Sequence, residues 1–184
     1  MPPGDRTWRL KILFAFPEVG RAVARAFLPL GYPVAGWSRR GRDVSSVASF
    51  AGADALPRLL AQSDVLVCAL PLMPETRGLL GRETLLLLPR GAFVVNVGRG
   101  EQLVEADLRA LLDDGHLAGA ALDVFERKPP PAGDPTWSYP KVIATPHIAA
   151  RASFDTVAAQ CLDPLRSVRR GEAPRQVVDR GTGY

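Results

Sequence analysis

Residues 10–31 read LKILFAFPEVGRAVARAFLPLG, an apolar run of strand length followed by a stretch whose apolar residues recur at helical spacing. A helix from Val19 to Leu30 would carry the apolar residues at positions 19, 23, 26, 27 and 30 on one face, and Gly31 just beyond is typical of helix ends. A strand that leads directly into an amphipathic helix is the first half of a βα unit. We therefore predict that the fold begins with a strand from Leu10 to Phe14 and a crossover helix.

The same alternation of apolar runs and amphipathic stretches continues along the chain. Continuously apolar runs of strand length indicate strands that helices cover on both faces of the sheet. The clearest later helix runs from Glu105 to Asp114 and ends at Gly115. The pattern predicts an α/β fold with a doubly wound parallel sheet of about six strands. Besides Leu10 to Phe14, the predicted strands are Pro33 to Trp37, Asp64 to Leu70, Ala92 to Val97, Ala118 to Asp123 and Val142 to Thr145.

The last third of the chain contains two segments of another kind. The stretch from Arg127 to Pro140 is rich in proline, which predicts a constrained surface loop. A final helix is expected from about Ala150 to Arg170, with an interruption near Pro164, and a polar tail follows it. We therefore predict one α/β domain over residues 1–149 and a C-terminal helix with its tail over residues 150–184.

Composition excludes several classes of protein. With 184 residues, 47% of them hydrophobic and 23% charged, the chain matches an ordinary globular protein with one core. No apolar run approaches the ~20 residues that cross a bilayer, so we expect no membrane partner and a cytoplasmic location. The net charge of +4 is too dispersed for a nucleic-acid surface. Cys68 and Cys161 match neither a zinc-binding nor a disulfide spacing, so we expect both to be buried and predict no metal site.

The loop after the first predicted strand departs from a known nucleotide-binding pattern. A dinucleotide-binding (Rossmann-like) fold places G-x-G-x-x-G between its first strand and first helix, where this chain has Ala15, Pro17 and Gly20. Gly20 retains the glycine that lets helix and strand pack closely, but Pro17 has no N–H to offer a pyrophosphate. By itself this segment fits an ordinary strand, turn and helix as well as a nucleotide site.

The second predicted strand ends in Ser38, Arg39 and Arg40, where NAD-binding proteins carry an acidic residue for the ribose 2′-hydroxyl. Guanidinium groups bind phosphate through paired charge-assisted hydrogen bonds, so this strand end suits the 2′-phosphate of NADP. The alternative is that these arginines, together with Arg42, only solvate a surface loop. Combined with the motifs that follow, the strand end favours NADP, with NADPH preferred over NADH.

Several further segments carry a family resemblance. In their order and spacing they resemble the signature segments of the D-2-hydroxyacid dehydrogenases. The tail, and the Trp-Ser-Arg sequence after the second strand, further resemble the glyoxylate/hydroxypyruvate reductase branch, so the likeness covers nearly the whole chain. The segments are PLMPETRG at 71–78, LPRGAFVVNVGRG at 88–100, LAGAALDVF at 117–125, TPHIAA at 145–150 and, in the tail, QVVDRGTGY at 176–184.

The resemblance implies a role for each residue of a site. Arg99 would bind the carboxylate and carbonyl oxygen of a small 2-keto acid, and His147 would protonate that oxygen as the general acid. The alternatives are a surface arginine and a structural histidine. Asp123 would contact the nicotinamide or its ribose. The resemblance implies cofactor contacts at Gly20, Ser38, Arg39, Arg40, Leu70, Pro71, Thr76, Val97, Gly98, Asp123, His147 and Ala149.

Two departures from the family pattern bear on activity. The family has a glutamate that orients the histidine and favours its protonated form, and its position holds Lys128 here, where an ammonium group would disfavour protonated His147. Glu126 would replace that glutamate only if the loop slipped, and its alternative is a surface carboxylate. The family's substrate domain of roughly a hundred residues precedes the cofactor domain, and we expect it to be missing here, which would expose an apolar face of the C-terminal helix.

Two functions are therefore open. The first is NADPH-dependent reduction of glyoxylate or hydroxypyruvate by a chain that, by resemblance, forms a homodimer. The second is a catalytically silent dinucleotide-binding or dimerisation module, which the residues at positions 15, 17 and 128 favour.

Overall fold

The computed structural model describes residues 9–14, 17–39, 47–128, 131–150, 152–174 and 177. By its internal contacts the chain divides into two compact units, Met1–Ala149 and Ala150–Tyr184. No helix within the described ranges is both long enough and apolar enough to cross a membrane.

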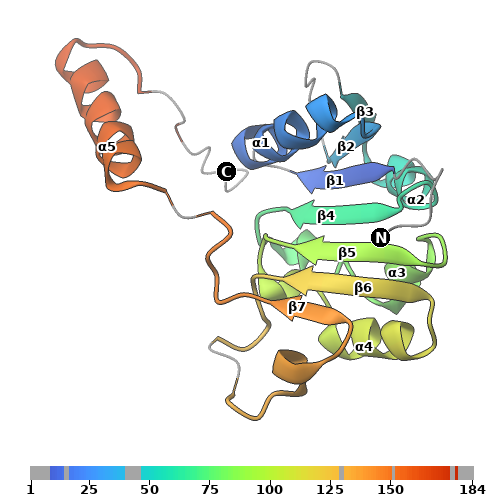
Figure 1. The fold of residues 1–184 in the computed structure, drawn as a ribbon. Helices are drawn as coiled ribbons and strands as arrows, with labels where there is room; N and C mark the ends of the chain where they lie inside the picture. Colours follow the sequence, from blue (N-terminus) through green and yellow to red (C-terminus); the bar gives the residue numbers. More distant parts are fainter. Residues whose placement is uncertain are drawn as a thin grey trace. The chain divides into compact units, whose positions relative to one another are not determined.

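The first unit is built on a parallel sheet of seven strands in the order β3-β2-β1-β4-β5-β6-β7 (Figure 1). The predicted doubly wound parallel α/β fold is confirmed, and six of the strands coincide with the predicted ones. The seventh, β3, was not predicted because it is an edge strand of only four residues, most of them exposed. The strands are β1 Leu10–Phe14, β2 Val34–Ser38, β3 Ala48–Ala51, β4 Val65–Ala69, β5 Ala92–Asn96, β6 Leu117–Leu122 and β7 Val142–Ala144.

Helices pack on both faces of this sheet because alternate residues of each strand point to opposite sides. The helix α1, Pro17–Phe27, continues into a 3-10 turn, Leu28–Leu30, and its Ala24 packs in a small core with Val67 of β4. The residues of β4 on either side of Val67, Leu66 and Cys68, belong to a larger core on the other face of the sheet. That core also receives leucines from α2 Leu56–Leu60, α3 Arg82–Leu86 and α4 Glu105–Asp113.

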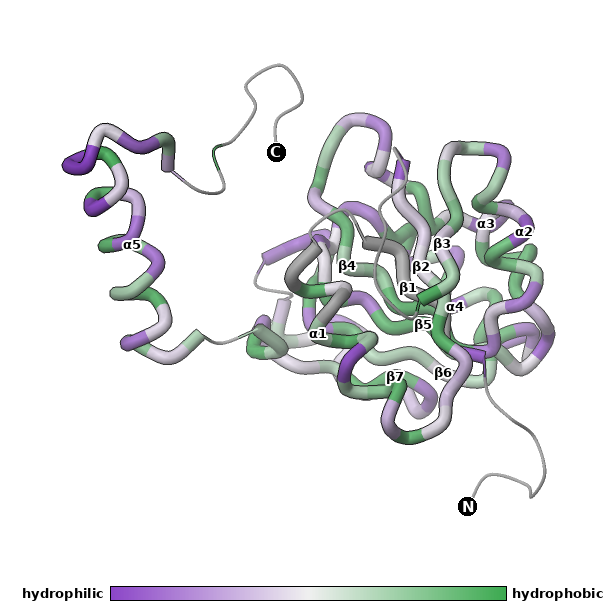
Figure 2. Tube along the Cα trace, turned by 90° about the horizontal axis from the view of Figure 1, so that it is seen from above, coloured by the Kyte–Doolittle hydropathy of each residue, from purple (hydrophilic) through white to green (hydrophobic). Residues whose placement is uncertain are grey.

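The strands are mostly hydrophobic along the tube in Figure 2, whereas the helices and connecting loops mix hydrophobic and hydrophilic positions. β4 lies at the centre of the sheet between β1 and β5. Because helices cover both faces of the sheet, a ligand site is expected at the ends of the strands. Short 3-10 helices shape several of the connecting loops there: η2 Ala53–Ala55, η3 Pro74–Thr76, η4 Gly100–Gln102 and η5 Pro135–Ser138.

The second unit consists mainly of one helix, α5, Phe154–Arg169, whose N-terminus is capped by the Ser153 side chain accepting the backbone N–H of Thr156. The predicted interruption near Pro164 is wrong, because α5 runs through this residue. A proline removes one backbone donor, and the helical hydrogen bonds on either side can still form.

One stripe of α5 is apolar and exposed, which agrees with the expected apolar face of the C-terminal helix; Figure 2 shows hydrophobic and hydrophilic positions alternating along it. Cys161 lies on this helix and is exposed, so its predicted burial is wrong, whereas Cys68 is buried as predicted. The stripe comprises Phe154, Val157, Leu162, Leu165 and Val168.

Candidate active site

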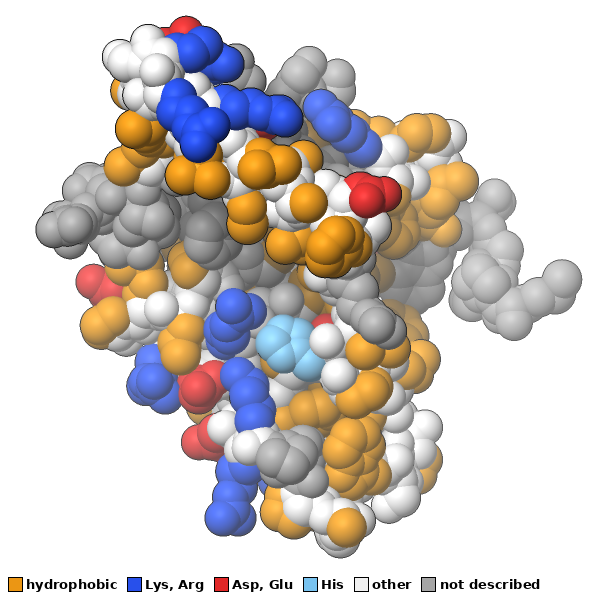
Figure 3. Space-filling model, turned by 90° about the vertical axis from the view of Figure 1, so that its left-hand side faces the viewer, with side chains coloured by type: hydrophobic (Ala, Val, Ile, Leu, Met, Phe, Trp, Pro, Cys, Tyr) orange, Lys and Arg blue, Asp and Glu red, His pale blue; other side chains and the backbone are white. Residues whose placement is uncertain are grey.

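The carboxyl ends of the strands bring most of the predicted site residues to one edge of the sheet. In open α/β sheets, ligands bind in the crevice outside this edge. Figure 3 looks onto the edge toward which the strands of Figure 1 point, and shows a histidine with basic, acidic and hydrophobic side chains around it. The predicted residues there are Ser38 and Arg39 at the end of β2, Leu70, Pro71 and Thr76 after β4, Val97, Gly98 and Arg99 after β5, Asp123 after β6, and His147 and Ala149 after β7.

The turn after β5 is closed by Asn96, a fully buried residue. Its Nδ2 donates to the backbone oxygen of Arg99 at 3.1 Å, and its Oδ1 accepts the backbone N–H of Gly98 at 3.1 Å. The Arg99 side chain is exposed, and its Nη1 donates to the Gly98 carbonyl at 2.8 Å. Asn96 thus determines the path of the backbone that presents the Arg99 guanidinium at the edge of the sheet.

Gln102 links this turn to the loop after β4, and sequence reasoning missed it. Its Nε2 donates to the carbonyl oxygens of Leu70 and Pro71 at 3.0 and 2.8 Å, and its Oε1 accepts the backbone N–H of Arg99 at 2.9 Å. The residue has no exposed surface. A lone glutamine in a loop predicts a surface position, so no local signal in the sequence identifies this buried connection.

Two glycines of the same turn are required by close backbone packing. A Cβ on Gly98 would lie 2.4 Å from Oε1 of Gln102 and 2.9 Å from the carbonyl oxygen of Leu70. A Cβ on Gly100 would lie 1.9 Å from both the backbone carbon and the oxygen of Phe125. The loops after β4, β5 and β6 therefore pack without space for a methyl group at either position.

The turn after β7 is held by Asp123, which is 3% exposed. Its Oδ1 accepts the Thr145 hydroxyl at 2.5 Å and the backbone N–H of Ile148 at 2.8 Å, and its Oδ2 accepts the backbone N–H of Ala149 at 3.0 Å. Burial alone would raise the pKa of Asp123, but these hydrogen bonds outweigh burial and lower that pKa below its ordinary value. Its carboxylate is therefore committed to the backbone that carries His147.

His147 itself has a backbone φ of 58°, an unusual conformation for a residue with a side chain. Its backbone N–H donates to the Thr145 carbonyl at 3.1 Å, which closes a tight turn, and its side chain is exposed. A residue kept in this conformation by surrounding contacts is a frequent feature of functional sites. The observed turn is consistent with a site that presents an imidazole outward.

His147 and Lys128 line the same cavity of about 210 Å³. Phe125 and Trp137 form part of its wall, with their ring centroids 5.4 Å apart. The remaining lining residues are Asp123, Val124 and Pro146.

Glu126 does not line the cavity of His147. It lines a separate cavity of about 240 Å³ with Arg109 and Asp134, and its backbone N–H donates to Oε1 of Glu105 at 2.9 Å. Lys128, not Glu126, is therefore the charged residue of this loop that accompanies His147.

The carboxyl end of β2 contains a buried hydroxyl group. Ser38 is 3% exposed, and within the described part of the chain its Oγ has no hydrogen-bond partner. The next residue, Arg39, is exposed, and its Nη1 lies 3.6 Å from Oε1 of Glu75 on η3. Ala15 and Arg40 lie outside the described residues, so the prediction for Arg40 stays a prediction.

The remaining predicted residues have structural partners. The Thr76 hydroxyl donates to the Pro71 carbonyl at 2.8 Å and also receives the backbone N–H of Met73 at 2.8 Å, which shapes the loop after β4. The backbone N–H of Val97 donates to the Cys68 carbonyl at 3.0 Å, and Gly20 is buried in α1. The cofactor contacts implied for these positions stay predictions.

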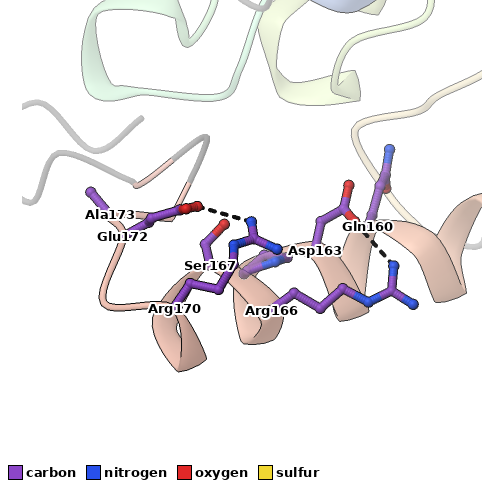
Figure 4. A pocket seen from close by; sticks show the side chains of 8 residues that line it. Gln160, Asp163, Arg166, Ser167, Arg170, Glu172 and Ala173 are labelled. Atoms are coloured by element: carbon purple, nitrogen blue, oxygen red, sulfur yellow. Dashed lines mark hydrogen bonds and ion pairs between the residues drawn. The ribbon is translucent and has the colours of Figure 1, made fainter.

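The second unit has a larger cavity of about 540 Å³ along α5, drawn in Figure 4. Its charged side chains neutralise one another: Arg166 pairs with Asp163 at 3.7 Å, and Arg170 pairs with Glu172 at 2.9 Å. Its lining includes neither a histidine nor the buried polar contacts found at the edge in the first unit. Among the described residues, no group of histidines, cysteines and carboxylates could hold a metal ion.

Comparison with known proteins identifies the family. Residues 11–149 match the family profile described as D-isomer specific 2-hydroxyacid dehydrogenase, NAD binding domain. Over 166 residues the chain is 37% identical to a glyoxylate/hydroxypyruvate reductase A of Photorhabdus laumondii, a match that covers 90% of this chain and 53% of that protein. The chain thus spans about half the length of the curated relatives it matches.

Comparison with solved structures points to the same family. A D-isomer specific 2-hydroxyacid dehydrogenase from Xanthobacter autotrophicus, in complex with NADPH and MES, has a TM-score of 0.91 and 42% identity over 100% of this chain and 77% of that chain. An NADPH-dependent glyoxylate/hydroxypyruvate reductase from Sinorhizobium meliloti, in complex with NADP and sulfate, has a TM-score of 0.89 and 34% identity over 96% of this chain and 57% of that chain. The chain therefore belongs to the D-isomer specific 2-hydroxyacid dehydrogenases and contains their NAD-binding domain.

Proposed function

We propose that this chain binds NADPH and, with a substrate-binding domain of the family type, reduces a small 2-keto acid such as glyoxylate or hydroxypyruvate. The observation that carries the proposal is the placement of Arg99 and His147 at one sheet edge, each on a turn held by a buried polar side chain. The NADPH-dependent reductases among its relatives support the choice of reaction and substrate class.

The end of β2 fits the 2′-phosphate of NADPH. A buried hydroxyl without a hydrogen-bond partner costs free energy, and a phosphate oxygen would supply the acceptor that the Ser38 hydroxyl lacks among the described residues. Arg39 beside it would neutralise the phosphate charge through its guanidinium. Positions 38–40 contain no acidic residue to hold a ribose 2′-hydroxyl, so NADPH is expected to bind better than NADH.

Arg99 and His147 would act on the substrate in different ways. Arg99 would bind the carboxylate of the keto acid and polarise its carbonyl oxygen, because a guanidinium offers two parallel donors with a permanent charge. NADPH, when bound, supplies the hydride that reduces the carbonyl carbon. His147 would deliver a proton to the carbonyl oxygen and become neutral, which completes the hydroxyl group of the product.

A second candidate is a dinucleotide-binding or dimerisation module without catalysis. Two residues favour it: Lys128 stands where the family glutamate is expected, and Pro17, the first residue of α1, has no N–H for a pyrophosphate. A homodimer is part of both proposals and is measured by sedimentation of the purified chain.

Titration of the purified chain with NADPH, followed by cofactor fluorescence, tests binding first. We expect saturable binding that is weaker for NADH and weaker in Arg39→Met. Absence of binding up to millimolar NADPH contradicts both the reductase and the dinucleotide-binding module, and leaves only a dimerisation module. If NADPH binds, glyoxylate-dependent loss of NADPH absorbance should disappear in Arg99→Ala and His147→Ala and persist in the control Arg82→Ala. Binding without turnover would favour the silent module.

A further inference from the structure

Lys128 is paired with a carboxylate that the family pattern does not predict. Its Nζ lies 3.5 Å from Oε2 of Glu101, which stands on η4, two residues after Arg99. The Glu101 side chain is 25% exposed and that of Lys128 is 41% exposed, so both charges are partly shielded from water. The chain therefore has a lysine where a glutamate is expected, and a glutamate beside that lysine.

Glu101 is ionised in this arrangement. A backbone hydrogen bond lowers the pKa of its carboxyl, burial opposes this, and the charges of Lys128 and Arg77 lower it further, below the ordinary value. Oε2 has no hydrogen-bond partner among the described residues, and the ammonium group of Lys128 is the counter-charge in contact with it. The pair is thus an anion beside a cation.

The pair matters because Lys128 also lines the cavity of His147. Among the described residues, the only other ionisable group that lines this cavity is Asp123, whose carboxylate interacts electrostatically with His147 while its two oxygens accept hydrogen bonds from the turn after β7. An ammonium group that shares a cavity with an imidazole disfavours the protonated form that a general acid needs. A carboxylate in contact with the ammonium reduces that effect by offsetting its charge and by determining where it lies.

We propose that Glu101 is a positioning residue that holds Lys128 and offsets its charge, so that His147 can carry a proton beside a lysine. The inference rests on the proposed function in one respect, because that function makes His147 the proton donor. The electrostatic claim concerns the folded chain and can be tested without substrate or cofactor. In this chain the carboxylate that supports the histidine would thus act through the lysine rather than touch the imidazole directly.

The experiment follows the ring proton signals of the histidines by NMR across a pH series in the intact chain. The chain has only two histidines, and His147→Asn identifies the signal of His147. Glu101→Gln should lower the ratio of protonated to neutral His147 at a given pH by roughly twofold to fivefold, and Lys128→Met should raise it by roughly threefold to tenfold. In the Lys128→Met background, Glu101→Gln should change the ratio by less than about twofold.

Glu126→Gln is the matched control, because it removes the same charge from a residue that lines the other cavity. It should leave the ratio unchanged, and Glu101→Asp should restore it toward the original value. Additive effects of Glu101→Gln and Lys128→Met would overturn the proposal, as would an effect of Glu126→Gln as large as that of Glu101→Gln. A chain that fails to bind NADPH but shows the non-additive pattern would reject the proposed function and keep this inference.

Discussion

Asp123→Asn should destabilise the fold by removing the charge that holds the turn carrying His147. Asp123 is 3% exposed and accepts three hydrogen bonds, from the Thr145 hydroxyl and from the backbone N–H groups of Ile148 and Ala149. An asparagine retains one oxygen for the first two donors, but its amide nitrogen would face the N–H of Ala149, donor against donor.

The size of the loss follows from these contacts. One charge-assisted hydrogen bond is lost, the other two become weaker, and the N–H of Ala149 is left without its acceptor. Each such loss costs about 1 to 3 kcal/mol. Relaxation of the exposed turn recovers part of this, so we expect the free energy of unfolding to fall by about 3 kcal/mol. The turn itself should open, with loss of the positive φ at His147.

The effect depends on pH with a definite sign. The pKa of Asp123 in the folded chain lies below its ordinary value of 3.8. A lowered pKa means that the carboxylate stabilises the fold above pH 3.8 and that this contribution is lost as the pH falls through the lower, folded-state value. The difference in stability between the parent chain and Asp123→Asn should therefore be greatest near neutral pH and shrink in acid.

Urea unfolding followed by circular dichroism measures the stability, and amide hydrogen exchange at Ile148 and Ala149 reports the turn. Asp54→Asn, at an exposed position, is the control and should have no effect beyond about 0.5 kcal/mol. Equal stability of Asp123→Asn and the control at neutral pH, with unchanged exchange, would refute the assigned role of this carboxylate.

Three other measurements test the packing of the edge. Gly100→Ala should reduce the free energy of unfolding by about 3 kcal/mol, because its methyl group would lie 1.9 Å from the backbone of Phe125; an unchanged urea midpoint would show that the loops can separate. Gln102→Leu should cost about 2 to 3 kcal/mol in the same assay, since it leaves buried backbone groups unpaired, and a neutral result would contradict the hydrogen bonds described. Burial raises the pKa of Cys68 to about 12, so the native chain should react with one equivalent of a thiol reagent, at exposed Cys161, and with two after denaturation; two in the native chain would refute the burial of Cys68.

The fold is largely readable from the sequence because each central strand is a continuous apolar run between helical segments. The predicted ranges of β4 and β5, for example, agree closely with the observed ones at both ends. The strand β3 was not predicted because four mostly exposed residues at a sheet edge need no apolar pattern. Their pairing with β2 is decided by tertiary contacts. The predicted interruption of α5 was wrong because the local effect of Pro164 does not determine whether the rest of a helix forms.

The site could be predicted only where residue type and position along the strands carry the information. Arg99 and His147 follow predicted strands, so their place at the carboxyl edge can be inferred from the sequence alone. Gln102 and Glu101 act through partners far along the chain, the backbone of Leu70 and the side chain of Lys128. No local pattern encodes such contacts, because they depend on how separate loops pack against one another.

The contacts that place Arg99 and His147 all lie within the unit Met1–Ala149, through Asn96 and Gln102 for one and Asp123 for the other. Within the described part of the chain, the two catalytic candidates are therefore positioned by contacts of this unit, and both side chains are exposed. Electrostatic interactions with a substrate are weak in water and strengthen when water is excluded. Under the proposed function, NADPH affinity and turnover should therefore respond differently to the addition of a substrate-binding domain that excludes water from this edge.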